Sequence, residues 1–291
     1  MPHDTRTVFQ SPHACIQDFR CDGRCHQHTK REECTDAHEL VFVRHGAWVR
    51  RDAGGRRLAD AGQLVFFNRG APYEIEHPLG GDECTIVSFP ADVILRTAGD
   101  LGLCVADAER PFARGSVPLP ATMQWLHRQL LASRTSLERD ELALEILGQS
   151  LEASQDRPQF RNTLGEADRR ELAHAASVAL ARDYRQPVTL AALAAELGCS
   201  RFHLARAFRQ WSGRSIHQHL IELRLAAALQ DLCTTTRPVS EIAHDLGFFD
   251  HAHFTTTFTR HFGSTPSNAR AAAQPAKEWP SVARSWGKSS G

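Results

Sequence analysis

Two stretches of the sequence decide the fold of the C-terminal half: LAAELGCSRFHLARAFRQWSGRS at residues 193–215 and IAHDLGFFDHAHFTTTFTRHFGST at residues 242–265. The stretches follow one pattern, in which an aliphatic-Ala pair, a Leu-Gly pair, a Ser or Asp, two large apolar residues and a Gly recur in order. The offset between the copies is 49 residues up to the Leu-Gly pair and 50 residues after it. The sequence therefore contains a degenerate internal repeat.

Each copy of the repeat has the pattern of a short helix, a tight turn and a second helix. Gly198 and Gly247 suit the left-handed backbone conformation that ends a helix. Ser200 and Asp250 can accept hydrogen bonds from the unpaired N–H groups that open the next helix. Large apolar residues then recur every fourth position, so that one face of the second helix packs inward and the other is free to enter a major groove.

The second copy and the residues before it carry a longer motif. It consists of Arg224-Leu225-x-x-Ala228 and of the run VSEIAHDLGFFDxxHFxxxFxRHFGSTPSxxR from Val239 to Arg270. This motif resembles the signature of the AraC/XylS family of transcriptional regulators. The resemblance implies an all-α domain with two helix–turn–helix units, joined by a linker helix at roughly residues 216–232, that bind successive major grooves of double-stranded DNA.

Most of the matching positions predict packing, and a second set predicts DNA contact. We expect the core to include Leu193, Leu204, Phe208, Ile242, Phe254 and Phe258. Carried over from the family, the DNA-binding candidates are Ser200, Arg201, Phe202, His203, Arg206, Arg209, Asp250, His251, His253, Thr256, Thr257 and Arg260. Arg206 is the strongest candidate, because an arginine can bond guanine O6 and N7 together. The short Thr256 and Thr257 depart from the longer side chains common in the family, which weakens the expected base readout by the second unit.

Charge gives the DNA-binding prediction only modest support. The whole chain has 34 basic and 34 acidic residues and a pI near 7.3, whereas a nucleic-acid binder usually has a basic footprint. Helix N-termini and hydroxyl groups can supply neutral phosphate contacts, so this balance does not exclude binding.

The N-terminal half has a different character. Short β-branched and aromatic runs between residues 40 and 90, separated by Gly and Pro, predict an antiparallel barrel or jelly roll. In a chain of this family, the segment resembles a cupin-like sensor. The predicted fold class is thus α+β, with an N-terminal cupin-like antiparallel β-barrel followed by the all-α domain. The predicted divisions are 1–118 for the Cys/His-rich arm and sensor, 119–156 for a helical hairpin, 165–272 for the DNA-binding domain and 273–291 for a flexible tail.

Two amphipathic helices are predicted at residues 121–132 and 137–154. They either cover the barrel or form a dimer interface, which the family resemblance makes plausible. Both alternatives stay open on the sequence.

Cysteine and histidine gather in the N-terminal segment, where four of each lie between His13 and His38. We hypothesise a metal site formed by Cys21, Cys25, Cys34 and His38, because thiolate and imidazole ligands suit zinc or an iron–sulfur cluster. The spacing is not the familiar paired C-x2-C. A thiol switch without metal and a polar arm with no ligand are the alternatives.

The predicted function is a sequence-specific transcriptional regulator, with activation favoured, whose N-terminal half responds to an effector, a metal or a redox change. Its expected partners are double-stranded DNA, RNA polymerase, a second copy of the chain and a small-molecule or metal effector. With no transmembrane span or signal sequence predicted, we expect a cytoplasmic protein that contacts no membrane. The alternative function is a metal-dependent cupin enzyme fused to a DNA-binding module. We prefer the regulator, with no catalytic residues, because no complete set of cupin ligands can be read from the strands.

Overall fold

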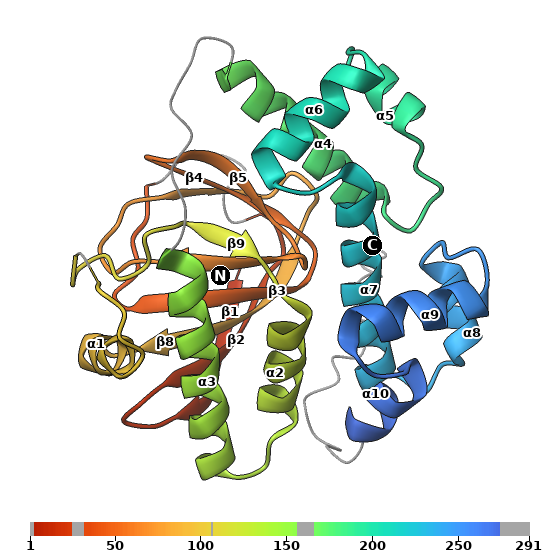
Figure 1. Cartoon of the computed structure of the whole chain (residues 1–291). Helices are drawn as coiled ribbons and strands as arrows, with labels where there is room; N and C mark the ends of the chain where they lie inside the picture. The colour runs from red at the N-terminus through yellow and green to blue at the C-terminus, as the bar shows by residue number, and fades with distance from the viewer. Residues whose placement is uncertain (1–2, 25–31, 106, 156–165, 274–291) are drawn as a thin grey trace, which may run out of the picture.

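The fold consists of an antiparallel β half followed by a helical half (Figure 1). It is known from a computed structural model that describes residues 3–24, 32–105, 107–155 and 166–273. The strands are β1 (His3–Gln10), β2 (Cys15–Cys21), β3 (His38–His45), β4 (Trp48–Asp52), β5 (Gly55–Ala59), β6 (Gln63–Phe67), β7 (Glu74–Glu76), β8 (Asp82–Phe89) and β9 (Ser116–Pro118).

The helices cover the sheet and then form the C-terminal half. The first three are α1 (Ala91–Asp100), α2 (Ala121–Ala132) and α3 (Ser136–Gln155). The C-terminal half is built from α4 (Glu166–Asp183), α5 (Leu190–Glu196), α6 (Arg201–Ser212), α7 (Ile216–Thr234), α8 (Val239–Asp245), α9 (His251–Phe262) and α10 (Pro266–Ala273).

The strands form two sheets, and these do not close into the barrel that the sequence predicted. One sheet has the order β1-β2-β8-β3-β6-β9 and the other the order β5-β4-β7. A closed barrel needs two neighbours for every strand, whereas among the described strands β1 and β9 each pair with one. The antiparallel pairing itself is confirmed.

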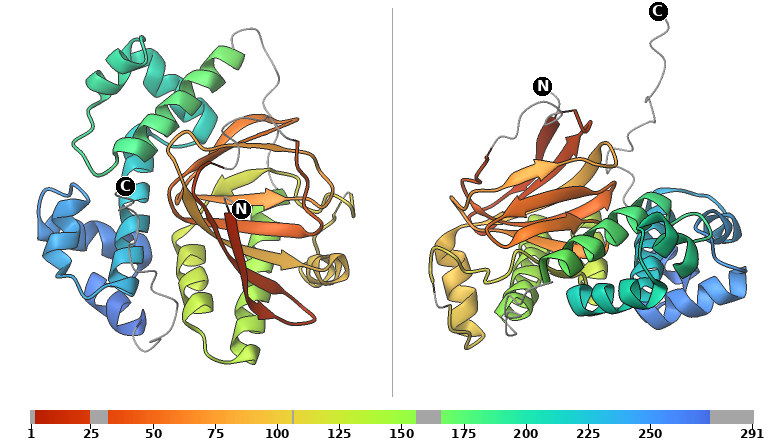
Figure 2. Two further views of the ribbon diagram at one scale, coloured as in Figure 1. Left: turned by 180° about the vertical axis from the view of Figure 1, so that it is seen from behind. Right: turned by 90° about the horizontal axis from the view of Figure 1, so that it is seen from above.

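The larger sheet is buried on both faces because its central strands are apolar at successive positions. Leu40 and Phe42 of β3 pack with Ile146 and Leu147 of α3 in the main core. The alternate residues of β3 face a second cluster that includes Trp48. Figure 2 shows α2 and α3 beneath one face of this sheet. The buried faces of the two predicted amphipathic helices thus cover the sheet.

The N-terminal half also packs against the helical half. Helix α2 contacts α9 and α10, and Trp125 of α2 packs against the second helical cluster. The Arg128 side chain donates a hydrogen bond to Gln230 of α7. Near the other end of α7, His219 Nε2 lies 3.2 Å from Asp60 Oδ2, and both side chains are buried. These contacts tie the β half to both ends of α7 and to α9 and α10.

Among the described residues, no helix is long and apolar enough to cross a membrane.

Candidate functional site

The two copies of the repeat fold into two matching units. Helices α5 and α8 each have seven residues, and helices α6 and α9 each have twelve. The turns between them contain Gly198 and Gly247, with φ of 65° and 70°. Because an L side chain resists this conformation, glycine fixes the same turn in both units.

Side-chain caps fix where the second helix of each unit begins. The Ser200 hydroxyl accepts a hydrogen bond from the His203 N–H at 3.1 Å, and the Asp250 carboxylate accepts one from the His253 N–H at 2.6 Å. The predicted N-caps are therefore both confirmed. A carboxylate or hydroxyl in this position satisfies an otherwise unpaired donor and sets the helix entry.

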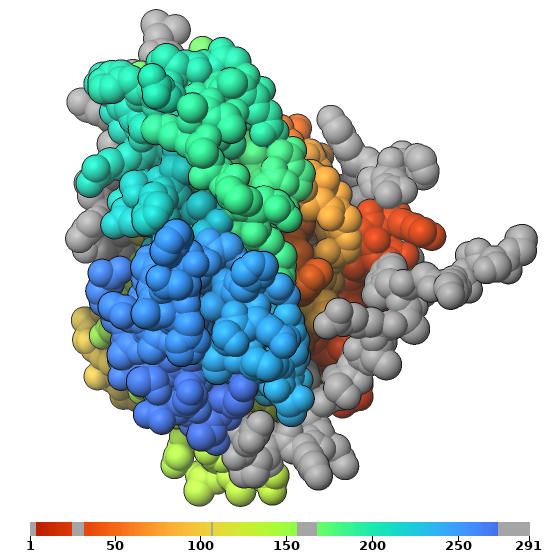
Figure 3. Space-filling model, turned by 90° about the vertical axis from the view of Figure 1, so that its right-hand side faces the viewer, coloured from red at the N-terminus to blue at the C-terminus, as the bar shows by residue number. Residues whose placement is uncertain are grey.

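The apolar stripe of each second helix is buried as predicted. In α6 the buried residues are Leu204, Ala207 and Phe208, and in α9 they are Phe254, Thr257 and Phe258. The opposite faces are exposed. Figure 3 shows the two units stacked one above the other over the same side of the molecule.

Eleven of the predicted DNA-binding residues are exposed: Ser200, Arg201, Phe202, His203, Arg206, Arg209, Asp250, His251, His253, Thr256 and Arg260. Thr257 contradicts its prediction, because its side chain is only 4% exposed. It occupies the position equivalent to Ala207, where the helix packs on its own unit. Thr257 is therefore a core residue and cannot reach a base.

The structure adds an exposed residue that the prediction left out. Phe249 is 93% exposed, and it stands beside the extra residue of the second turn. Its neighbour Phe248 packs edge-on against Phe254, with ring centroids 5.0 Å apart. The extra residue thus lets one phenylalanine fill the core while the other projects from the surface. Two consecutive phenylalanines directly before an N-cap are the sequence signal that could have predicted the exposed Phe249.

Arg224 of the linker helix ties the two units together. Its guanidinium donates hydrogen bonds to the carbonyl oxygens of Tyr184 (2.7 Å) and Gln186 (2.9 Å), in the loop before the first unit. It donates a third to the carbonyl oxygen of Gly247 at 2.7 Å, in the turn of the second unit. Arg224 is 7% exposed, and its burial lowers its pKa. This side chain fixes the orientation of one unit relative to the other.

The distance between the units is set by α7. Nineteen residues at about 1.5 Å each make this helix about 28 Å long. That length is comparable to the rise of one turn of B-DNA, about 34 Å. The arrangement is suited to contacting two neighbouring grooves on one face of a duplex.

The four residues predicted to bind metal do not come together. Cys21 pairs with Asp82 at one end of β8, whereas His38 pairs with Phe89 at the other end. Seven residues of strand separate these positions, about 23 Å. Cys25 lies outside the described residues, and Cys34 is exposed. A single ion cannot contact both Cys21 and His38, so this ligand set is wrong.

Comparison with known proteins agrees with this architecture. The family model of a helix-turn-helix domain matches residues 193–272, and that of an AraC-like ligand binding domain matches residues 18–147. The regulatory protein SoxS of Salmonella typhimurium is 35% identical over 85 residues, which are 29% of this chain and 79% of SoxS. The HTH-type transcriptional activator RhaR of Escherichia coli is 35% identical over 91 residues, which are 31% of this chain and 32% of RhaR.

One similar solved structure is that of an AraC-type transcriptional regulator from Chromobacterium violaceum. It is 31% identical, with coverage of 38% of this chain and 98% of that one and a TM-score of 0.35. The fold, the repeat and the relatives define a DNA-binding transcriptional regulator with an N-terminal ligand-binding domain. The chain belongs to the AraC/XylS family.

Proposed function

We propose that α6 and α9 enter successive major grooves and that Arg206 makes the main base contact. The observation that carries this proposal is the pair of equivalent, side-chain-capped helices with exposed outer faces. Arg206 lies in the middle of the exposed face of α6, between Phe202 and Arg209, four residues before it and three after it. A bidentate arginine–guanine contact discriminates against the wrong base by about 1–3 kcal/mol.

The second unit contributes more to positioning than to base readout. Its exposed face carries His251, His253, Thr256 and Arg260, where the first unit carries three arginines. Arg260 and the N-terminus of α9 are suited to phosphate contacts, which fix register without specifying sequence. Phe249 adds an exposed aromatic surface beside them.

The test is a binding measurement on operators selected from a random library. Arg206→Ala should weaken binding to the selected operator by about tenfold or more and relax the preference at one base pair. Arg185→Ala is the matched control, because Arg185 is an exposed arginine of the same half that lies outside the recognition helices. Unchanged affinity and unchanged base preference in Arg206→Ala would remove Arg206 from this role.

Regulation is proposed to work by activation, through a homodimer that contacts RNA polymerase. Support comes from the relative named as a transcriptional activator and from the ligand-binding domain match. An effector in the N-terminal half acts by binding one arrangement of the two halves more tightly than another. A ligand with equal affinity for both arrangements would leave the equilibrium between them unchanged. The interdomain contacts of α2 and α7 are the contacts that such a shift would change.

The metal-dependent enzyme has weaker support. The matching relatives are named as regulators, and the described strands do not close into a barrel. We propose that the protein is a regulator without an enzymatic activity of its own.

A further inference from the structure

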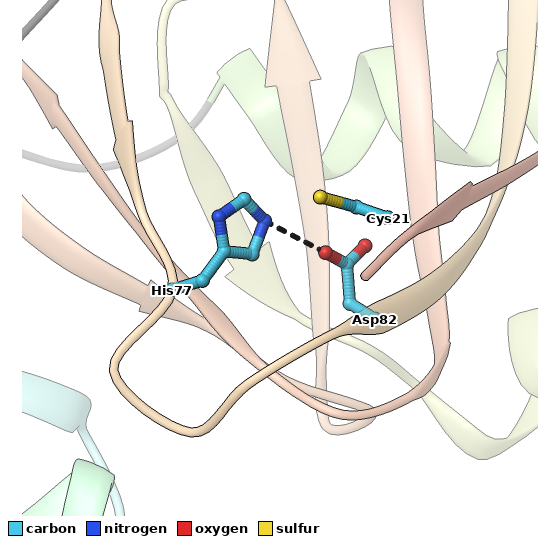
Figure 4. Close-up of side chains that lie close together, drawn as sticks. All are labelled: Cys21, His77 and Asp82. Carbon is cyan, nitrogen blue, oxygen red and sulfur yellow. Dashed lines mark hydrogen bonds and ion pairs between the residues drawn. The ribbon is translucent and has the colours of Figure 1, made fainter. Parts of the chain in front are cut away.

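A cluster of potential metal ligands lies at one end of the larger sheet. Cys21 ends β2, Asp82 begins β8, and the two residues pair directly across the strands. His77 follows β7 and reaches the same point from the connecting loop. Figure 4 shows the three side chains pointing toward one another. The fold thus brings together a cysteine and an aspartate that are 61 residues apart in the sequence.

The ligand atoms of the three side chains are close and shielded from water. One Sγ, one imidazole nitrogen and one carboxylate oxygen lie within 4.8 Å of one another. His77 Nε2 lies 2.8 Å from Asp82 Oδ1, and these side chains are 4% and 1% exposed. Cys21 is also buried, and its Sγ accepts a hydrogen bond from the Gly23 N–H at 3.3 Å.

A neighbouring cysteine holds the aspartate of the cluster in place. Cys84 lies two residues after Asp82 on β8, so that both side chains project from the same face of the strand. Its buried Sγ donates a hydrogen bond to Asp82 Oδ2 at 3.0 Å. Cys84 therefore orients the Asp82 carboxylate, and the cluster itself offers one sulfur, one nitrogen and one carboxylate.

We propose that Cys21, His77 and Asp82 bind one divalent transition-metal ion, with zinc(II) as the best match. Cysteine sulfur, imidazole nitrogen and carboxylate oxygen are the three kinds of protein ligand that zinc takes. Zinc bond lengths place neighbouring ligand atoms about 3.3–3.8 Å apart, so the His77–Asp82 contact opens by about half an ångström when the ion enters. The Cys21 thiol gives its proton to solvent as the metal–sulfur bond forms, and His77 binds through Nε2 as a neutral imidazole whose proton is on Nδ1.

The backbone around the cluster is packed too closely for side chains. A Cβ on Gly81 would lie 2.3 Å from the Cys21 carbonyl oxygen, and one on Gly46 would lie 2.3 Å from the Gly81 carbonyl oxygen. A Cβ on Gly23 would lie 2.6 Å from the Gly80 carbonyl carbon. Glycines in three loops therefore let the backbone approach closely around the ligands. This close approach holds the ligands in place before the metal arrives.

The loop that carries His77 and Asp82 also contacts the helical half. Leu79 packs against the same small apolar cluster, Ala47, Val49 and Leu58, as Val178 and Ala181 of α4, and Pro78 lines a surface pocket with residues of the same helix. Helix α4 packs against α6, the first recognition helix. Metal occupancy would thus change the stiffness of a loop that supports the DNA-binding units.

The test uses the full chain, stripped of metal with a chelator and titrated with cobalt(II) as a spectroscopic substitute for zinc. We expect one ion per chain and a sulfur-to-cobalt charge-transfer band, with both displaced by zinc(II). Cys21→Ser and His77→Ala should each lower the cobalt affinity by at least about tenfold. His77→Cys, which restores a soft ligand, should retain stoichiometric binding.

Cys34→Ser is the matched control, because Cys34 is an exposed cysteine of the same half that lies outside the cluster. It should bind cobalt as the wild type does. Circular dichroism of each variant without metal checks that the fold is kept. The proposal is overturned if the folded wild type binds no cobalt or zinc, if Cys21→Ser and His77→Ala keep wild-type affinity, or if Cys34→Ser loses binding as they do.

Discussion

Replacing Arg224 by methionine should loosen the two DNA-binding units from each other. The change keeps an aliphatic side chain and removes three charge-assisted hydrogen bonds, which measure 2.7, 2.9 and 2.7 Å. Bonds to charged donors contribute about 1.5–3 kcal/mol each, and the cost of burying the guanidinium offsets part of the sum. We expect Arg224→Met to lower the free energy of unfolding by about 3 kcal/mol.

The assay is urea unfolding followed by far-ultraviolet circular dichroism, together with binding to a two-groove operator. When the two units are held rigidly together, binding of the first unit to its groove places the second unit at the next groove, so the second contact is effectively intramolecular. Loosening the units from each other should therefore also weaken operator binding. The control is Arg185→Met. Arg185 is an exposed neighbour whose guanidinium lies over the Tyr184 ring at 5.3 Å, and its loss should cost less than about 0.5 kcal/mol. If Arg224→Met unfolds within about 0.5 kcal/mol of the wild type, Arg224 does not couple the units.

Two pH-dependent predictions concern carboxyl groups, one half-buried (Glu39) and one buried (Asp60). Burial, with a smaller contribution from Asp36, raises the pKa of Glu39 to about 7. Between about pH 4.5 and pH 7 the folded state therefore holds a proton that the unfolded state has lost, so the free energy of unfolding falls as the pH rises through this range. Glu39→Gln removes this loss. It should stabilise the protein by up to about 3 kcal/mol at pH 8 and have little effect at pH 4. Equal effects of Glu39→Gln at both pH values would contradict this. Burial alone would raise the pKa of Asp60, but His219 and Arg214 together hold it below its ordinary value. The interaction of Asp60 with His219 and Arg214 stabilises the folded state above that ordinary pKa, and this stabilisation is lost as the carboxyl protonates in acid. In urea unfolding, Asp60→Asn should therefore lower the free energy of unfolding by about 3 kcal/mol at pH 7 and by less below pH 4. An Asp60→Asn variant as stable as the wild type at pH 7 would mean that this interdomain contact is not stabilising.

The helix–turn–helix units could be predicted from the sequence because their signals are local. Periodic apolar residues, a glycine turn and a capping Ser or Asp all lie within one short stretch, and the structure places each of them as expected. Thr257 was mispredicted because a polar residue on an amphipathic helix suggests exposure. Its alignment with Ala207 would have shown that this position packs inward.

The N-terminal half was harder to predict because its signals are long-range. Strand β2 was missed, since the buried Asp18 interrupts its apolar alternation and is compensated by Arg44 from β3. Strand propensity does not state which strands pair, so barrel closure could not be tested on the sequence. The Cys21–His77–Asp82 cluster likewise depends on strand register, whereas sequence proximity drew attention to Cys25, Cys34 and His38.

Changing the spacing between the two half-sites of a selected operator tests the central claim most directly. Inserting five base pairs rotates the second groove by about half a helical turn relative to the first. Because Arg224 and α7 hold the units in one orientation, we predict that the insertion lowers the affinity to that of a single half-site. An insertion that leaves the affinity unchanged would contradict the account, because two fixed recognition helices cannot follow a groove to the opposite face of the duplex.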